Sequence, residues 1–249
     1  MAKLNVNIDL VARLRELRKT PYPDLLEAAR ICEAAGAAGI TVHLRGDRRH
    51  IQDADLPALR KIITTRLNLE MAVTEEMIRI ALAVKPEMIT LVPESPGEVT
   101  TQGGLDVVRG FDAVKDCFAR TMPAGIHGST FIDPDEAQID ASKRAGAQSV
   151  ELCTARYSDA LSAGEEDREF ETVRRAAAHA QKIGLLVNVG HGLTYGNTAR
   201  LAALPGLADF NTGHAIIIQA VFDGLYKAVA DMVGLVEGAE KQGCTGCTG

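Results

Sequence analysis

The stretch Gly39-Ile-Thr-Val-His-Leu-Arg-Gly-Asp-Arg-Arg-His50 is an apolar run that leads directly into a cationic turn. The apolar part, up to Leu44, has the pattern of a buried strand. His43 lies at the end of this strand, and three arginines and His50 follow it. Guanidinium groups match phosphate oxygens two at a time, so the turn predicts an anion site for phosphate esters beside a group that can carry a proton.

Strand-like runs of this kind recur along the chain, with helical patterns between them. The runs are Leu4–Asp9, Gly39–Leu44, Leu67–Ala72, Met88–Pro93, Gly125–Asp133, Ser149–Cys153, Leu185–Val189 and Ala208–Thr212. Helix starts are predicted at Thr74-Glu-Glu-Met77 and at Asp133-Pro-Asp-Glu136, the second with proline in the first turn. Helix ends are predicted at Gly36, Gly146 and Gly184.

The alternation of strands and helices predicts the fold. Eight units in about 240 residues, without a linker rich in proline or glycine, fit a single (β/α)8 TIM barrel over residues 1–240. A doubly wound sheet is the alternative, but no Gly-x-Gly-x-x-Gly follows the first strand to indicate dinucleotide binding. Residues 241–249 contain Cys244 and Cys247 without a second pair to complete a zinc site, which favours a flexible tail.

Composition limits the class of partner. Among 249 residues, 46% are hydrophobic and 24% charged, with a net charge of -6, which argues against a general nucleic-acid surface. No apolar run approaches the roughly 20 residues of a membrane helix, and no leader is expected, which favours a cytoplasmic protein. Five cysteines make a disulfide framework improbable. The expected partner is therefore a small molecule.

The active site of such a barrel forms at the carboxyl ends of its strands. Glu70 interrupts an apolar strand there, and burial would raise its pKa into the range useful for proton transfer. The alternative is a structural carboxylate paired with an arginine. His191 lies between two glycines, which allow a ligand to approach closely. Other polar residues at strand ends are Asn7, Asp9, His43, Arg45, Glu94, Asn188, Asn211 and His214.

Two loops complete the expected site. The backbone amides of Gly213 and His214 open a helix after the eighth strand, where this fold often binds phosphate. An ordinary tight turn is the alternative there. The segment Thr100-Thr-Gln-Gly-Gly-Leu-Asp106 is rich in hydrogen-bond donors and could close as a lid, or it could be a disordered loop.

Taken in order, these residues resemble the pyridoxine 5′-phosphate synthase family over residues 4 to about 236. So many ordered matches are hard to obtain by chance. The stretches that carry the resemblance are Val6–Asp9, Ile40–Arg45, Asp47–Ile51, Asn68–Met77, Leu91–Glu94, Glu98–Thr101, Gly103–Val107, Phe131–Asp133, Val187–Asn188, Gly190–Tyr195 and Gly213–Ile217.

The resemblance implies condensation of 3-amino-2-oxopropyl phosphate with 1-deoxy-D-xylulose 5-phosphate to pyridoxine 5′-phosphate, phosphate and water, without a metal or redox cofactor. It implies that His43 and Glu70 accept protons and that His191 donates one. The residues implied to hold the amino ketone and the developing product are Asn7, Arg18, Gly192, Gly213 and His214. Those implied to hold the pentulose phosphate are Asp9, Arg45, His50 and Thr100. Similar proteins assemble dimers into an octamer.

The chain departs from the family pattern at Leu10 and Cys153, where histidines are usual, and at Gln219, where arginine is common. Each change removes charge or polarity from the mouth of the barrel. Two other functions stay open at this point. One is another phosphosugar isomerase or epimerase that uses Glu70 and His191. The other is a non-catalytic relative that binds a B6 phosphate ester, for which Leu10 is the best argument.

Overall fold

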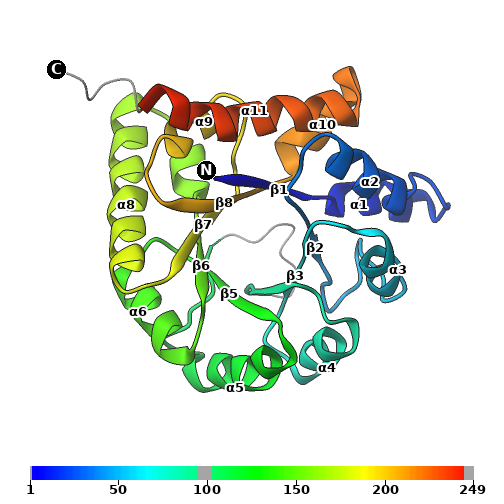
Figure 1. Ribbon diagram of the computed structural model, residues 1–249, viewed down its shortest axis with the longest axis horizontal. Coiled ribbons are helices and arrows are strands. Elements are labelled where there is room, and N and C mark those ends of the chain that lie inside the picture. The colour runs from blue at the N-terminus through cyan, green and yellow to red at the C-terminus, as the bar shows by residue number, and fades with distance from the viewer. Residues whose placement is uncertain (1, 95–102, 244–249) are drawn as a thin grey trace.

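The computed structural model describes residues 2–94 and 103–243. Eight parallel strands pair in sequence order, and β1 also pairs with β8, so the sheet closes into a barrel (Figure 1). The closed barrel confirms the predicted fold, and the doubly wound alternative is wrong. The strands are β1 Lys3–Asn7, β2 Gly39–His43, β3 Leu67–Met71, β4 Met88–Leu91, β5 His127–Ile132, β6 Ser149–Cys153, β7 Leu186–Gly190 and β8 Leu207–Thr212.

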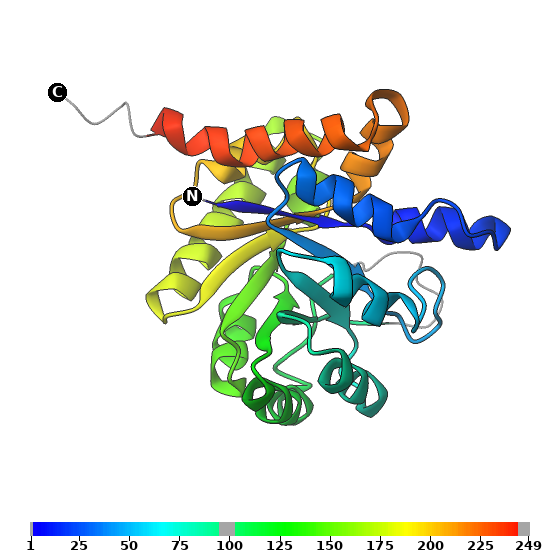
Figure 2. The same cartoon turned by 45° about the vertical axis from the view of Figure 1, so that its right-hand side comes forward.

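Helices surround the barrel, and α11 lies along one side of it, packed against α2 and α10 (Figures 1 and 2). None of the helices in the described ranges is long and apolar enough to cross a membrane. Residues 244–249 of the expected tail lie outside the described part. The helices are α1 Asp9–Arg18, α2 Leu25–Ala34, α3 Asp55–Ile62, α4 Glu75–Val84, α5 Phe111–Thr121, η1 Met122–Ala124, α6 Glu136–Ala145, α7 Ala155–Ser158, α8 Ala163–Lys182, α9 Thr198–Ala202, α10 His214–Asp223 and α11 Leu225–Gly243.

Local signals explain most helix boundaries. The Thr74 hydroxyl accepts a hydrogen bond from the backbone N–H of Met77, which caps α4 as predicted. The predicted glycines end their helices with positive φ, as at Gly146, where φ is 103°. The prediction that proline lies in the first turn of α6 is wrong. Asp135 caps this helix by accepting from the N–H of Gln138, so Pro134 precedes the cap.

β1 ends earlier and β5 begins later than predicted, because a polar residue and a glycine turn the backbone at these places. β1 ends at Asn7, whose side-chain oxygen accepts a hydrogen bond from the N–H of Asp9 at 2.9 Å. Asp9 therefore lies in the first turn of α1 instead of ending the strand. Gly125 has φ of 85° and ends η1, so β5 begins at His127.

The interior of the barrel contains a chain of buried polar side chains. The Thr90 hydroxyl donates to Asn68 at 2.9 Å, Asn68 donates to Thr41 at 3.4 Å, and Thr41 donates to Asn211 at 3.3 Å. All four side chains are buried. Because buried polar groups need partners, this chain fixes the relative positions of β2, β3, β4 and β8 below the strand ends.

We expect apolar packing between strands and helices to supply most of the stability. Leu59 of α3 is fully buried and Leu161 is 96% exposed. Leu59→Ala should lower the free energy of unfolding by about 2–5 kcal/mol, because it removes buried methyl groups and leaves a cavity. Leu161→Ala should change it by less than about 0.5 kcal/mol. Urea unfolding of both variants checks this, and equal losses would contradict the packing described.

Candidate active site

Four of the predicted residues meet at the ends of β1 and β2. One carboxylate oxygen of Asp9 accepts the backbone N–H of His43 at 2.9 Å, and the other accepts the Asn7 amide at 2.9 Å. The first oxygen also lies 3.9 Å from Nδ1 of His50. Asp9 thus links the first strand end to His43 and to the cationic turn. The structure brings Asn7, Asp9, His43 and His50 together, as the sequence predicts.

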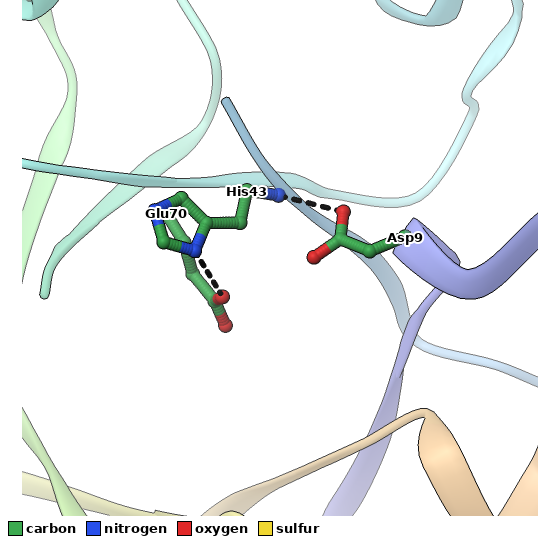
Figure 3. Close-up of side chains that lie close together, drawn as sticks. All are labelled: Asp9, His43 and Glu70. Carbon is green, nitrogen blue, oxygen red and sulfur yellow. Dashed lines mark hydrogen bonds and ion pairs between the residues drawn. The ribbon is translucent and has the colours of Figure 1, made fainter. Parts of the chain in front are cut away.

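The His43 imidazole lies between two carboxyl groups. Its Nε2 is 2.8 Å from Oε1 of Glu94, and its Nδ1 is 4.0 Å from Oε2 of Glu70 (Figure 3 shows the Glu70 side). The other oxygen of Glu94 accepts the N–H of Gly46 at 3.0 Å. Burial raises the pKa of Glu94, but the hydrogen bonds from His43 and Gly46 outweigh it and hold this pKa below its ordinary value.

Glu70 and Glu151 place two carboxyl groups in one barrel interior; Glu151 is buried, and the side chain of Glu70 is 16% exposed. Burial, together with the negative charges of Glu151 and Asp9, raises the pKa of Glu70 well above its ordinary value. Burial also raises the pKa of Glu151 to about 8, against the hydrogen bond that Asn211 donates to it. Both groups are therefore suited to exchange protons near neutral pH.

Sequence analysis missed Glu151. It interrupts the apolar strand Ser149–Cys153 as Glu70 interrupts Leu67–Met71, and this shared pattern could have identified it. Space for its carboxyl group comes from Gly190 on β7, where an added Cβ would lie 2.1 Å from Oε1 of Glu151. A side chain at position 190 would therefore clash with the carboxyl group of Glu151, and only glycine leaves room for it.

The cationic turn separates into residues with different tasks. Arg45 is 5% exposed, and its Nε has no hydrogen-bond partner in the described part of the chain; Asp47 lies 3.6 Å away. Arg48 instead bonds to both oxygens of Asp53 and to Glu76. The prediction that all three arginines bind phosphate is therefore wrong for Arg48, which links the turn to α4 through its ion pair with Glu76.

His191 follows β7 in a left-handed backbone conformation, with φ of 76°, which is uncommon for a residue other than glycine. The Thr154 hydroxyl lies 2.8 Å from the carbonyl oxygen of Gly190 and 2.6 Å from that of His191, which holds this conformation. Burial lowers the pKa of His191, with His214 acting in the same direction and Asp159 against it. Gly192 also has positive φ and packs against Ser158.

Gly213 and His214 lie where β8 meets α10, beside the end of β1. A Cβ added to Gly213 would lie 2.3 Å from the carbonyl oxygen of Asn7, so glycine is needed for this contact. Arg18, by contrast, is exposed at the far end of α1. It lies roughly 13 Å along the helix from Asp9, so the structure does not bring it to the site. Thr100 lies outside the described residues.

The three positions that depart from the family pattern have structural roles. Leu10 packs against the apolar core. Cys153 is buried, and burial raises the pKa of its thiol to about 11, which makes it a poor nucleophile. Gln219 donates to Asp223 at 2.8 Å, one turn further along α10. None of the three contacts His43, Glu70 or His191 through a hydrogen bond in the described ranges.

One set of side chains among the described residues has the spacing of a metal site. Ligand atoms of Asp9, His43 and Glu70 all lie within 4.8 Å of one another (Figure 3). Two of the three residues already take part in hydrogen bonds: Asp9 accepts from Asn7 and from the backbone of His43, and Nε2 of His43 bonds to Glu94. The geometry therefore fits a hydrogen-bonded proton-transfer site better than a metal centre.

Comparisons with known proteins find one family over nearly the whole chain. A family model described as "Pyridoxal phosphate biosynthesis protein PdxJ" matches residues 4–238. The chain is 53% identical over 237 residues to pyridoxine 5′-phosphate synthase of Geobacter sulfurreducens, covering 95% of this chain and 99% of the relative. It is 54% identical over 229 residues to the synthase of Photobacterium profundum, covering 92% and 94%.

Solved structures show similarity of fold alone. A phosphoribosylanthranilate isomerase from Thermotoga maritima has a TM-score of 0.59 at 10% identity, covering 96% of this chain and 100% of the other. A 4-hydroxy-2-oxoglutarate aldolase/2-deydro-3-deoxyphosphogluconate aldolase has a TM-score of 0.62 at 16% identity, covering 94% of both chains. Different reactions on one barrel are expected, because function depends on the site.

The raised pKa of Glu151 makes stability depend on pH. Its carboxyl group titrates at about 8 when folded and near its ordinary 4.5 when unfolded. The contribution to stability is complete below the unfolded pKa and is lost as pH rises through the folded pKa. The amide in Glu151→Gln does not titrate. Between about pH 5 and about pH 8.5, the free energy of unfolding of Glu151→Gln should therefore rise relative to that of the parent, by more than about 1 kcal/mol over this range.

Unfolding free energies of both proteins across this range measure the effect. Glu136→Gln, which changes an exposed carboxylate on α6, is the matched control and should show no such gain. If the difference in free energy of unfolding between Glu151→Gln and the parent does not change with pH, the raised pKa of Glu151 is contradicted.

Proposed function

Because the chain belongs to the PdxJ family of pyridoxal phosphate biosynthesis proteins, we propose that the side chains gathered at its strand ends perform the family's ring-closing condensation. The chain is an enzyme with pyridoxine 5′-phosphate synthase activity. It condenses 3-amino-2-oxopropyl phosphate with 1-deoxy-D-xylulose 5-phosphate and releases phosphate and water. The observation that supports the site most strongly is the placement of His43 between Glu70 and Glu94.

Imine formation, phosphate elimination and ring closure each move protons to or from the reacting atoms. Glu70 and His43 supply these steps as acceptors, because both protonation states of a carboxyl group with a raised pKa are accessible near neutral pH. Glu151, buried on β6, lies close enough for its charge to raise the pKa of Glu70, and we include it as a third group. These three groups form the proton-transfer set of the proposed mechanism.

His191 is the proposed proton donor. Burial lowers its pKa in the free protein, so it is mainly neutral at pH 7 before substrate arrives. A bound phosphate brings negative charge, which raises the pKa of a nearby imidazole. We therefore propose that substrate binding charges His191 and makes it competent to donate.

Two phosphorylated substrates need two anion sites. Arg45, with its unpaired Nε, and His50 offer one in the cationic turn, together with Asp9 for the sugar hydroxyls. The amides of Gly213 and His214 offer the second, beside Asn7 and next to the end of the neighbouring strand β7, which Gly192 follows. An isomerase acting on one phosphate ester would use only one of these sites. The assignments of Arg18 and Thr100 rest on the resemblance alone.

The reaction is tested by mixing the purified protein with both substrates and omitting each in turn. Pyridoxine 5′-phosphate and inorganic phosphate should form only when both are present. Glu70→Gln should lower kcat by at least about 100-fold, because the amide cannot transfer a proton, while product binding is retained. Glu136→Gln should leave kcat unchanged. Turnover by Glu70→Gln at the parent rate would contradict the role of Glu70.

The surface of α1, α10 and the start of α11 supports a homo-oligomer. α1 contacts α10, and large apolar side chains on these helices are exposed to solvent. They are Leu14, Leu17, Ile218, Val221, Phe222 and Tyr226, with Phe222 81% exposed. Exposed apolar side chains gathered on neighbouring helices are typical of a protein interface, and a second copy of the chain is the occupant that we propose. Dimers assembled into an octamer are the expected final state.

Replacing Phe222 with glutamate tests this surface. Charge in an apolar interface is costly to desolvate, so Phe222→Glu should shift the assembly toward smaller species in sedimentation velocity. Glu136→Gln should sediment like the parent. A parent protein that sediments as a monomer at micromolar concentration would contradict the proposed interface.

We also propose the cytoplasm as the location of this enzyme. The described cysteines, Cys32, Cys117 and Cys153, are free thiols buried in the protein. Free thiols are typical of a reducing compartment.

A further inference from the structure

We propose that Glu94 is the positioning residue for His43: its carboxylate holds the imidazole with the proton on Nε2 and leaves Nδ1 as the base. This inference rests on the proposed function, because it refines how His43 accepts a proton there. Glu94 lies just beyond β4, and sequence analysis recognised it only as a polar residue at a strand end. The structure places its carboxylate against the catalytic imidazole.

Both oxygens of Glu94 are fixed in place. Oε1 lies 2.8 Å from Nε2 of His43, and Oε2 accepts the N–H of Gly46 at 3.0 Å. Gly46 belongs to the cationic turn that follows His43, and a Cβ there would lie 3.4 Å from Oε2. The backbone of His43 is held separately by Asp9. The imidazole and the carboxylate are therefore positioned from opposite sides, by β2 and by the chain after β4.

The two neighbours of the ring require the same tautomer. Glu94 is ionised, since its pKa is lowered, and an ionised carboxylate only accepts hydrogen bonds, so Nε2 carries the proton. On the other side, Oε2 of Glu70 lies 4.0 Å from Nδ1, and burial raises the pKa of this carboxyl group, which favours its protonated form. A protonated Glu70 can donate toward a lone pair on Nδ1, whereas an N–H at Nδ1 would place two donors face to face.

Among residues 2–94 and 103–243, no second carboxylate hydrogen-bonds to Nε2 of His43. Within the described ranges, Glu94 is the carboxylate that hydrogen-bonds the His43 ring, while the His50 ring lies 6.1 Å away between centroids. When Nδ1 accepts a proton, the ring becomes an imidazolium, and the negative charge of Glu94 stabilises it. A base oriented by a third group in this way is the arrangement found in nucleophilic and proton-transfer sites generally.

The substitution Glu94→Gln keeps the shape of the side chain but removes its negative charge and introduces an NH2 donor. Its amide can turn NH2 toward Nε2, which forces the imidazole proton onto Nδ1. We expect kcat to fall by at least about 100-fold, with KM for either substrate changed by less than about threefold. Glu94→Asp keeps the charge and should recover part of the lost kcat. Glu75→Gln, which removes an exposed carboxylate paired with Arg120, is the matched control.

The tautomer itself is read by nitrogen NMR of histidine-labelled protein without substrate, with the His43 signals identified through His43→Asn. The parent should show a protonated Nε2 in His43, and Glu94→Gln a protonated Nδ1. A protonated Nδ1 in the parent, or an unchanged tautomer in Glu94→Gln, would overturn the inference. Absence of turnover in the parent would contradict the proposed reaction alone, because the tautomer is measured without it.

Discussion

Burial of two carboxyl groups in one closed barrel is the constraint on which the site depends. Glu70 on β3 and Glu151 on β6 are separated by two strands in the ring, yet closure of the sheet points both into the same interior. Two ionised carboxylates in such a place would be very costly, so the pKa of each group is raised, which favours the protonated forms, and Asn211 donates a hydrogen bond to Glu151. The chemistry follows from this, because a carboxyl group that stays protonated near neutral pH can both give and take a proton.

The surrounding structure keeps these protons usable. Below the site, the chain from Thr90 through Asn68 and Thr41 to Asn211 satisfies the buried polar groups and fixes the strands. Above it, Asp9 and Glu94 fix His43, while Arg48 binds acids of the turn and of α4, which leaves Arg45 for phosphate. The cationic turn thus combines a structural arginine with a ligand-binding one.

The fold was predictable because strand and helix patterns alternate clearly along the chain. The residue-level errors have physical causes. Pro134 was placed inside α6, but the Asp135 side chain caps the helix one residue later. Arg45 and Arg48 look equivalent in sequence, and only the fold brings Asp53 and Glu76 to Arg48. Glu151 carries the same local signal as Glu70, but its importance depends on a contact across the barrel that sequence spacing does not show.

The central claim is that at neutral pH the barrel holds protonated carboxyl groups beside His43, whose ring is oriented by Glu94. Infrared spectroscopy of the substrate-free enzyme tests it most directly, because protonated and ionised carboxyl groups absorb at different frequencies. Comparing the parent with Glu70→Gln and Glu151→Gln assigns each band. The account predicts carboxylic-acid absorption at pH 7, of which one part is lost in Glu70→Gln and another part in Glu151→Gln. A parent spectrum with both groups ionised at pH 7 would contradict it.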